Sequence, residues 1–128
     1  MDRTKPLATT ADILPYLKFI RNKKQEYFIC LSLDSGGRLI ARRIVTIGTL
    51  TSSLVHPRET FASPIRDRAA SIVIAHNHPS GDPTPSNADI SATQQLVAAG
   101  QLLGVKLDDH IIVSRNEHYS FRQQQLLI

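Results

Sequence analysis

Three residues with metal-binding side chains, His76, His78 and Asp89, lie close together in the second half of the chain. The histidines follow the compact apolar run 71–75, which is typical of a strand buried on both faces. Side chains two positions apart on a strand point the same way, so both imidazoles can address one ion. A loop stiffened by three prolines then leads to Asp89, in the first turn of an expected helix. We therefore expect the three side chains to converge where a strand ends and a helix begins.

Two imidazoles and one carboxylate are a ligand set typical of catalytic zinc, because a fourth coordination position is left for water. Zinc lowers the pKa of such a water to about 7, and a neighbouring carboxylate can take its proton. The resulting hydroxide can attack a polarised carbonyl, which is amide hydrolysis in outline. A single histidine at a strand end is usually just a hydrogen-bonded polar residue. The paired histidines and the returning acid favour a metal site.

The elements that must position these residues alternate between helix and strand in a mixed order. Periodicity, caps and turns predict helices over 10–22, from 57 and over 86–103, and strands over 26–33, 38–47, 71–75, 106–113 and 118–121. Ser86 is the expected N-cap of the long helix, and Gly104 is its expected stop. The fold class predicted from this order is α/β, with a mixed β-sheet flanked by helices.

The chain is 128 residues long, which is the size of one domain. Residues 1–8 are expected to be a flexible N-terminal segment and residues 9–128 to form the domain. Cys30 is the only cysteine and lies in an apolar run, so an internal disulfide is excluded and a buried, inert thiol is expected. No stretch is typical of a signal peptide or a membrane span, which favours a cytoplasmic location without membrane contact.

The chain is mildly basic, with a net charge of +4 and a pI near 9.6. This balance favours an anionic partner without requiring one. Basic clusters are found at 21–24, at 42–43 and at Arg66 and Arg68, but no aromatic residues alternate with them. The stacking platform of a single-strand binder is therefore missing, and weak nucleic-acid association through the basic surface is the most that we expect. The sequence indicates no oligomeric state.

The spacing His76-x-His78, seven residues, Ser86, two residues, Asp89 matches the metal signature of the JAMM (MPN+) metalloproteases at every position. The wider stretch 76–86 resembles the RadC family of bacterial JAMM-domain proteins. Segments 56–59 (His-Pro-Arg-Glu) and 107–112 (Leu-Asp-Asp-His-Ile-Ile) share this resemblance, which extends from about residue 9 onward.

The resemblance implies a cytidine-deaminase-like α/β sandwich with one Zn²⁺ held by His76, His78 and Asp89. Ser86 would steady the attacked carbonyl or the tetrahedral oxyanion, a role compatible with capping the helix. The JAMM pattern also needs an upstream glutamate as the base. We favour Glu26, at the start of the first strand, over Glu59, whose place at a helix N-terminus is already explained by the helix dipole.

The function expected from this resemblance is that of a zinc metallopeptidase or isopeptidase acting on a protein or peptide. The alternative is a DNA-repair-associated or mobile-element protein whose zinc-bearing domain serves nucleic-acid-linked or interaction roles without proteolysis. DNA repair is the family's traditional label. Full-length relatives resemble this domain with a helical DNA-associated module in front, whereas here about eight residues precede the first helix. His110 and Asp109 are expected either to hydrogen-bond a metal ligand or to pair structurally.

Overall fold

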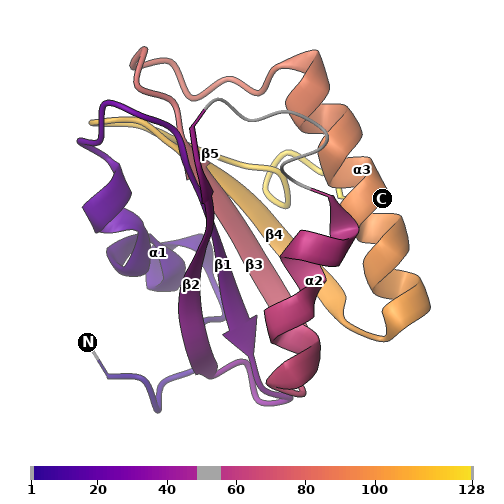
Figure 1. Cartoon of the computed structure of the whole chain (residues 1–128). Helices are drawn as coiled ribbons and strands as arrows, with labels where there is room; N and C mark the ends of the chain where they lie inside the picture. The colour runs from indigo at the N-terminus through magenta and orange to yellow at the C-terminus, as the bar shows by residue number, and fades with distance from the viewer. Residues whose placement is uncertain (1, 49–55, 128) are drawn as a thin grey trace.

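The structure is a computed structural model that describes residues 2–48 and 56–127. A five-stranded mixed sheet with the order β2-β1-β3-β4-β5 forms its centre, with α1 on one face and α2 and α3 on the other (Figure 1). The predicted α/β class is therefore confirmed. The elements are α1 (Thr10–Ile13), the 3₁₀ helix η1 (Leu14–Ile20), β1 (Tyr27–Leu33), β2 (Leu39–Ile47), α2 (Pro57–Arg66), β3 (Ser71–Asn77), α3 (Asn87–Leu103), β4 (Lys106–Val113) and β5 (His118–Ser120).

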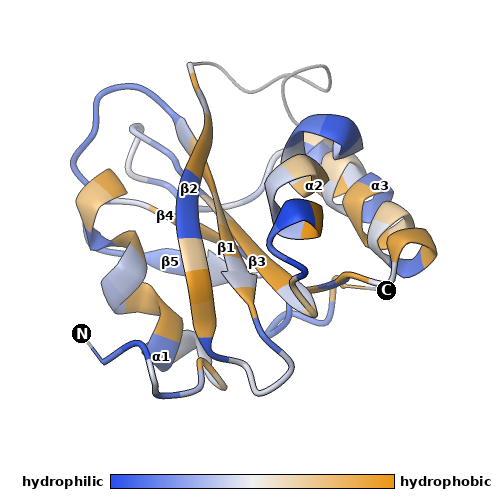
Figure 2. Cartoon of the chain, turned by 60° about the horizontal axis from the view of Figure 1, so that its bottom comes forward, coloured by the Kyte–Doolittle hydropathy of each residue, from blue (hydrophilic) through white to orange (hydrophobic). Residues whose placement is uncertain are grey.

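The central strand is β3, which pairs antiparallel with β1 and parallel with β4. All seven of its residues are buried, because helices cover both faces of the sheet. The parallel pairing requires a crossover, and α3 provides it between β3 and β4. In Figure 2 the strands are mostly hydrophobic, whereas the connecting loops are mostly hydrophilic.

Side chains of β3 alternate between two hydrophobic clusters, one on each side of the sheet. Val73 and Ala75 pack toward α1 and η1, while Ile72 and Ile74 pack toward α2 and α3. His76 follows Ile74 at a spacing of two, so it continues the face that α3 covers. Cys30 belongs to the same side, and burial raises the pKa of its thiol to about 12. This agrees with the predicted buried, inert thiol.

The first helix differs from its prediction. A continuous helix was expected over 10–22, but α1 has four residues and continues as the 3₁₀ helix η1 over seven more. Pro15 has no backbone N–H to donate to the carbonyl four residues earlier, so the α-helical ladder is interrupted there. Thr9 provides the N-cap, and its hydroxyl accepts from the N–H of Asp12.

Both ends of the described chain contact the domain. Within residues 2–8, Leu7 is buried and its N–H donates to the carbonyl of Gly37 at 2.8 Å. The flexibility of the N-terminal segment stays a prediction. The segment from residue 122 onward could be strand or helix by its sequence. The structure has a turn over residues 121–125. Across 2–48 and 56–127, no helix combines the length and the apolar character needed to cross a membrane.

Candidate metal centre

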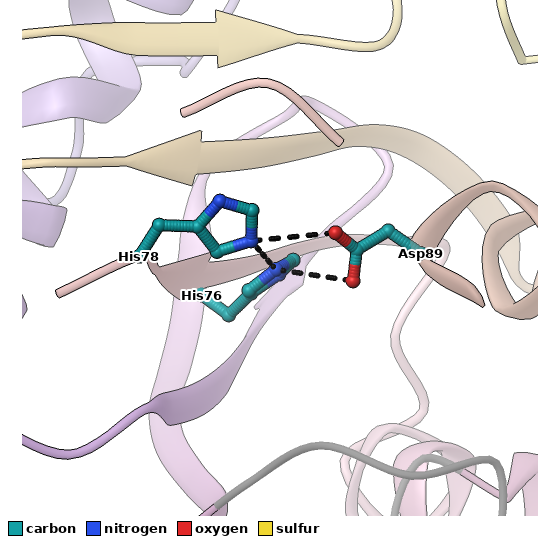
Figure 3. Close-up of side chains that lie close together, drawn as sticks. All are labelled: His76, His78 and Asp89. Carbon is teal, nitrogen blue, oxygen red and sulfur yellow. Dashed lines mark hydrogen bonds and ion pairs between the residues drawn. The ribbon is translucent and has the colours of Figure 1, made fainter. Parts of the chain in front are cut away.

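The predicted metal-binding residues meet at the end of β3 and the beginning of α3. His76 is the penultimate residue of β3, His78 begins the following loop, and Asp89 is in the first turn of α3. Figure 3 shows the two imidazoles and the carboxylate facing one another. Among the described residues, this is the group of histidine, cysteine and acidic side chains whose ligand atoms lie close enough together to hold a metal ion.

The three side chains form a triangle, in which one ligand atom of each lies within 4.8 Å of the others. The Nε2 atoms of His76 and His78 are 3.0 Å apart. The two oxygens of Asp89 face one histidine each: Oδ1 lies 3.4 Å from Nε2 of His76, and Oδ2 lies 3.3 Å from Nε2 of His78. His76 is buried, whereas His78 and Asp89 are partly exposed. The site is therefore open on the side of His78 and Asp89.

This triangle fits a tetrahedral zinc ion. Zn–N and Zn–O bonds of about 2.0–2.1 Å at tetrahedral angles separate neighbouring ligand atoms by about 3.3 Å. The 3.0 Å between the two Nε2 atoms is close to that value, and Asp89 brings a separate oxygen within 3.4 Å of each of them. Imidazole and carboxylate are also ligands that zinc accepts. The residues present therefore fit the metal that the sequence predicts.

A capping box at the start of α3 fixes the carboxylate of Asp89. The hydroxyl of Ser86 accepts from the N–H of Asp89 at 3.0 Å, and the N–H of Ser86 donates to Oδ2 of Asp89 at 2.8 Å. Burial opposes ionisation of Asp89, but the neighbouring side chains of His76 and His78 and the N–H of Ser86 outweigh it and lower the pKa of the carboxyl. Asp89 is therefore a carboxylate held ready in the helix N-terminus.

The second histidine is oriented by its own loop. Nδ1 of His78 lies 2.9 Å from the carbonyl oxygen of Asp82. Because that oxygen can only accept, Nδ1 carries the proton in the neutral ring and Nε2 is left as the ligand atom. The hydrogen bond to Asp89 raises the pKa of His78 against an opposing effect of burial, and the nearby charge of Glu26 raises it further.

Of the two candidate bases, Glu26 is the one next to the metal-binding residues. In the antiparallel pairing of β1 with β3, Phe28 is opposite His76. Continuing that register by two residues places Glu26 opposite His78. Glu26 is partly buried, and its charge contributes to the raised pKa of His78. Geometry therefore brings this carboxylate to the open side of the triangle.

Glu59 occupies a different place. It lies in the first turn of α2, is exposed, and its Oε1 is 3.4 Å from Nε of Arg58. It borders a cavity of about 220 Å³ together with Cys30 and Arg43, and none of the three metal-binding residues lines that cavity. The structure thus brings Glu26 to the triangle, while Glu59 faces another part of the surface.

Comparison with known proteins agrees with the fold. A sequence model of the RadC-like JAB domain matches residues 7–126. The chain belongs to the RadC-like JAB domain family. Its similar curated relatives include a UPF0758 protein of Protochlamydia amoebophila, 47% identical over 109 residues that cover 85% of this chain and 47% of that protein. Another, from Chlorobaculum tepidum, is 46% identical over 117 residues, which cover 91% of this chain and 53% of the relative. This chain thus spans about half the length of the curated relatives that it matches.

In this RadC-like JAB domain, Asn77 has a role that the sequence did not indicate. It stands between the two histidines, is fully buried, and points to the opposite side of the sheet from His76. Its Oδ1 accepts from the N–H of Tyr27 at 2.6 Å, and its Nδ2 donates to the carbonyl of Gln25 at 3.0 Å. These two partners flank Glu26 in sequence. Asn77 therefore ties the segment that carries the candidate base to the strand that carries the histidines.

We expect Asn77→Asp to lower the free energy of unfolding by about 1–3 kcal/mol at neutral pH, which is the usual cost of leaving buried polar groups unpaired. The aspartate still accepts from Tyr27 but faces the carbonyl of Gln25 with a carboxylate oxygen. Urea unfolding measures the change. The matched control is Asn116→Asp in the exposed β4–β5 turn, which should change stability by less than about 0.5 kcal/mol. Equal losses in both variants would contradict the role of Asn77.

The two residues of β4 that the sequence left open have different surroundings. Asp109 accepts from Ser120 Oγ at 2.6 Å and from the N–H of Arg122 at 2.9 Å, so it pairs structurally with the chain after β4. Burial raises the pKa of its carboxyl in spite of these bonds. His110 instead contacts His76, and burial lowers the pKa of its imidazole well below the ordinary value. The ring of His110 is therefore neutral.

Proposed function

We propose that this domain is a zinc-dependent hydrolase that cleaves peptide or isopeptide bonds. The observation that carries the proposal is the triangle of His76, His78 and Asp89, with a further carboxylate beside it. Its two Nε2 atoms are 3.0 Å apart, and each lies within 3.4 Å of one oxygen of Asp89. Membership of the RadC-like JAB family supports the same activity. The chain spans about half the length of its curated relatives. The substrate of a longer protein that contains this domain is therefore also a proposal.

His76, His78 and Asp89 would hold the zinc ion. When bound, zinc supplies a Lewis acid that polarises a carbonyl and lowers the pKa of a water molecule. His76 provides the buried, fixed side of the site, and His78 and Asp89 provide the side open to solvent and substrate. The lowered pKa of the Asp89 carboxyl favours its ionised form, which is the form that binds a cation.

Glu26 and Ser86 would act beside the zinc ion. The carboxylate of Glu26, next to His78, can accept a proton from the attacking water and deliver it to the leaving amine. The hydroxyl of Ser86 accepts from the N–H of Asp89 through its oxygen, so its own proton can be donated. That proton can stabilise the negative oxygen that develops on the attacked carbonyl.

A second candidate function is association with an anionic partner, nucleic acid included. The observation that favours it is a cavity of about 430 Å³ beside the loop that follows His78. The cavity is lined by residues 79–81, by one acidic side chain, Glu117, and by four basic side chains. The basic side chains are those of Arg21, Lys23, Lys24 and Arg115. The side chain of Arg21 already donates to two backbone carbonyls, which leaves fewer of these cations to contact phosphate. Hydrolysis therefore remains the better supported proposal.

The test combines metal analysis with peptide cleavage. The purified chain should hold close to one zinc per molecule, and it should cleave members of a panel of peptides and isopeptide-linked conjugates. A chelator should abolish cleavage, and added zinc should restore it. Retained zinc without cleavage of any substrate, together with DNA binding that disappears at modest salt, would favour the second candidate instead. A chain that binds no zinc would contradict the proposed hydrolase.

A further inference from the structure

His110 is a buried side chain that touches the candidate metal centre from behind. It lies on β4, the parallel neighbour of β3, and is 3% exposed. Its ring stacks on Phe121 with centroids 4.6 Å apart, and the edge of Phe28 lies on another side. Nε2 of His110 is 2.8 Å from Nδ1 of His76. The hydrolytic roles proposed above make no use of this contact.

The contact is one link of a longer chain of hydrogen bonds. Nδ1 of His110 is 2.6 Å from the hydroxyl of Thr93, a residue of α3 that is 1% exposed. The Thr93 hydroxyl donates to the carbonyl of Asp89, one turn earlier in the helix, at 2.7 Å. The chain therefore runs from the backbone of Asp89 through Thr93 and His110 to His76. It ends at Nε2 of His76, 3.4 Å from the carboxylate of the same Asp89.

Counting protons along this chain allows one arrangement. Thr93 has one hydroxyl proton, which it donates to the Asp89 carbonyl, so its oxygen must accept from Nδ1–H of His110. His110 is buried against Phe121 and Phe28, where a charged ring is costly, so its Nε2 carries no proton and can only accept, and Nδ1 of His76 must be its donor. Nε2 of His76 is thereby left with its lone pair, which in the metal-free chain can accept from Nε2–H of His78, 3.0 Å away, when that ring is protonated.

We propose that His110 and Thr93 are positioning residues that hold His76 in the tautomer and orientation required of a metal ligand. The proposal rests on the zinc site of the proposed function. Partners behind a ligating histidine commonly contribute about 10–100-fold to metal affinity, because they fix the ring and increase its basicity. Here α3 acts on His76 through Thr93, and β4 acts on it through His110. His76 is the one buried residue of the three.

The first test reads the tautomers directly and needs no metal. Long-range ¹H–¹⁵N NMR correlations of the metal-free chain at pH 8 should show both His76 and His110 protonated at Nδ1 and unprotonated at Nε2. His76 protonated at Nε2 would overturn the proposal, whatever the protein does with zinc. Because this test uses the metal-free chain, its failure does not depend on whether the proposed function is correct.

The second test measures zinc affinity by competition with a chromophoric chelator. Thr93→Val keeps the shape of the side chain but removes the hydroxyl, and it should weaken zinc binding about 10–100-fold. Thr93→Ser keeps the hydroxyl and should stay within about threefold of the wild type. His110→Gln can place an acceptor near the position of Nε2 and should bind zinc more tightly than His110→Leu.

A matched control separates this effect from a general loss of packing. Thr10 is also buried, and its hydroxyl has no hydrogen-bond partner within the described ranges 2–48 and 56–127. Thr10→Val is thus the same chemical change far from the site, and it should leave zinc affinity unchanged. Equal zinc affinities of Thr93→Val and the wild type, or a Thr93→Ser variant as weak as Thr93→Val, would overturn the proposal while leaving the metal site in place.

Discussion

Replacing Asp89 with asparagine is expected to weaken zinc binding by at least about 100-fold, since even partners behind a ligand contribute about 10–100-fold. The substitution removes the negative charge but keeps an oxygen that can accept from the N–H of Ser86. When that bond forms, the new amide N–H₂ takes the place of the oxygen that faces His76. A donor then stands where the metal needs an electron pair. Zinc affinity at pH 7.5, measured by chelator competition, reports the loss, and hydrolysis should disappear with it.

Asp82→Asn is the matched control for this change, because Asp82 lies in the same loop between the histidines and α3. Its side chain accepts from the N–H and the hydroxyl of Thr84 and is not part of the metal-binding group, and its charge interacts only weakly with His78. Zinc affinity in this control should stay within about threefold of the wild type. If Asp89→Asn also keeps its affinity and its stoichiometry, the carboxylate is not a ligand and the triangle does not describe the metal site.

Glu26→Gln is expected to keep zinc and lose most of its turnover. A positioned acid or base contributes about 10²–10⁴-fold to such a reaction, so kcat should fall by that factor while KM changes little. Glutamine preserves the size of the side chain but cannot take a proton. The variant also lacks a charge that raises the pKa of His78, so zinc affinity below neutral pH should hold or rise slightly. Cleavage rates and zinc stoichiometry are measured on the same preparation.

Glu59→Gln tests the other glutamate under the same conditions. Its exposed position in α2, beside a cavity that excludes the metal-binding residues, predicts a kcat close to that of the wild type. A Glu26→Gln variant with full activity and a Glu59→Gln variant without it would exchange the two assignments. Loss of zinc in Glu26→Gln would instead indicate that Glu26 acts on the metal site itself.

Local signals in the sequence were enough to predict the elements that carry the triangle. The apolar run before His76 predicted β3, Ser86 predicted the start of α3, and Gly104 in a left-handed conformation with φ 73° ends that helix as expected. Each of these signals acts within one turn or one strand, so it can be read without knowledge of the tertiary fold. The convergence of the three ligands followed from strand alternation and a short, stiff connection.

Features that depend on register could not be predicted in this way. The position of Glu26 opposite His78 follows from the pairing of β1 with β3, and that of His110 behind His76 follows from the pairing of β3 with β4. A strand's own sequence says which of its residues share a face, but it does not say which residues of another strand lie opposite them. Asn77 was missed for the same reason, because its partners belong to a segment about fifty positions away.

The two hydrophobic clusters on either side of the sheet are formed without any of the three ligand residues. The energy that folds this domain therefore comes from side chains that never meet the ion. In zinc fingers, by contrast, the metal-free chain is unfolded, so metal binding must also supply the free energy of folding. An ion bound at the triangle would meet ligand atoms that burial and a helix cap have already arranged, so its interaction energy would be expressed as tightness of binding. Loading and unloading of a metal would then be an equilibrium of a folded protein rather than a folding transition.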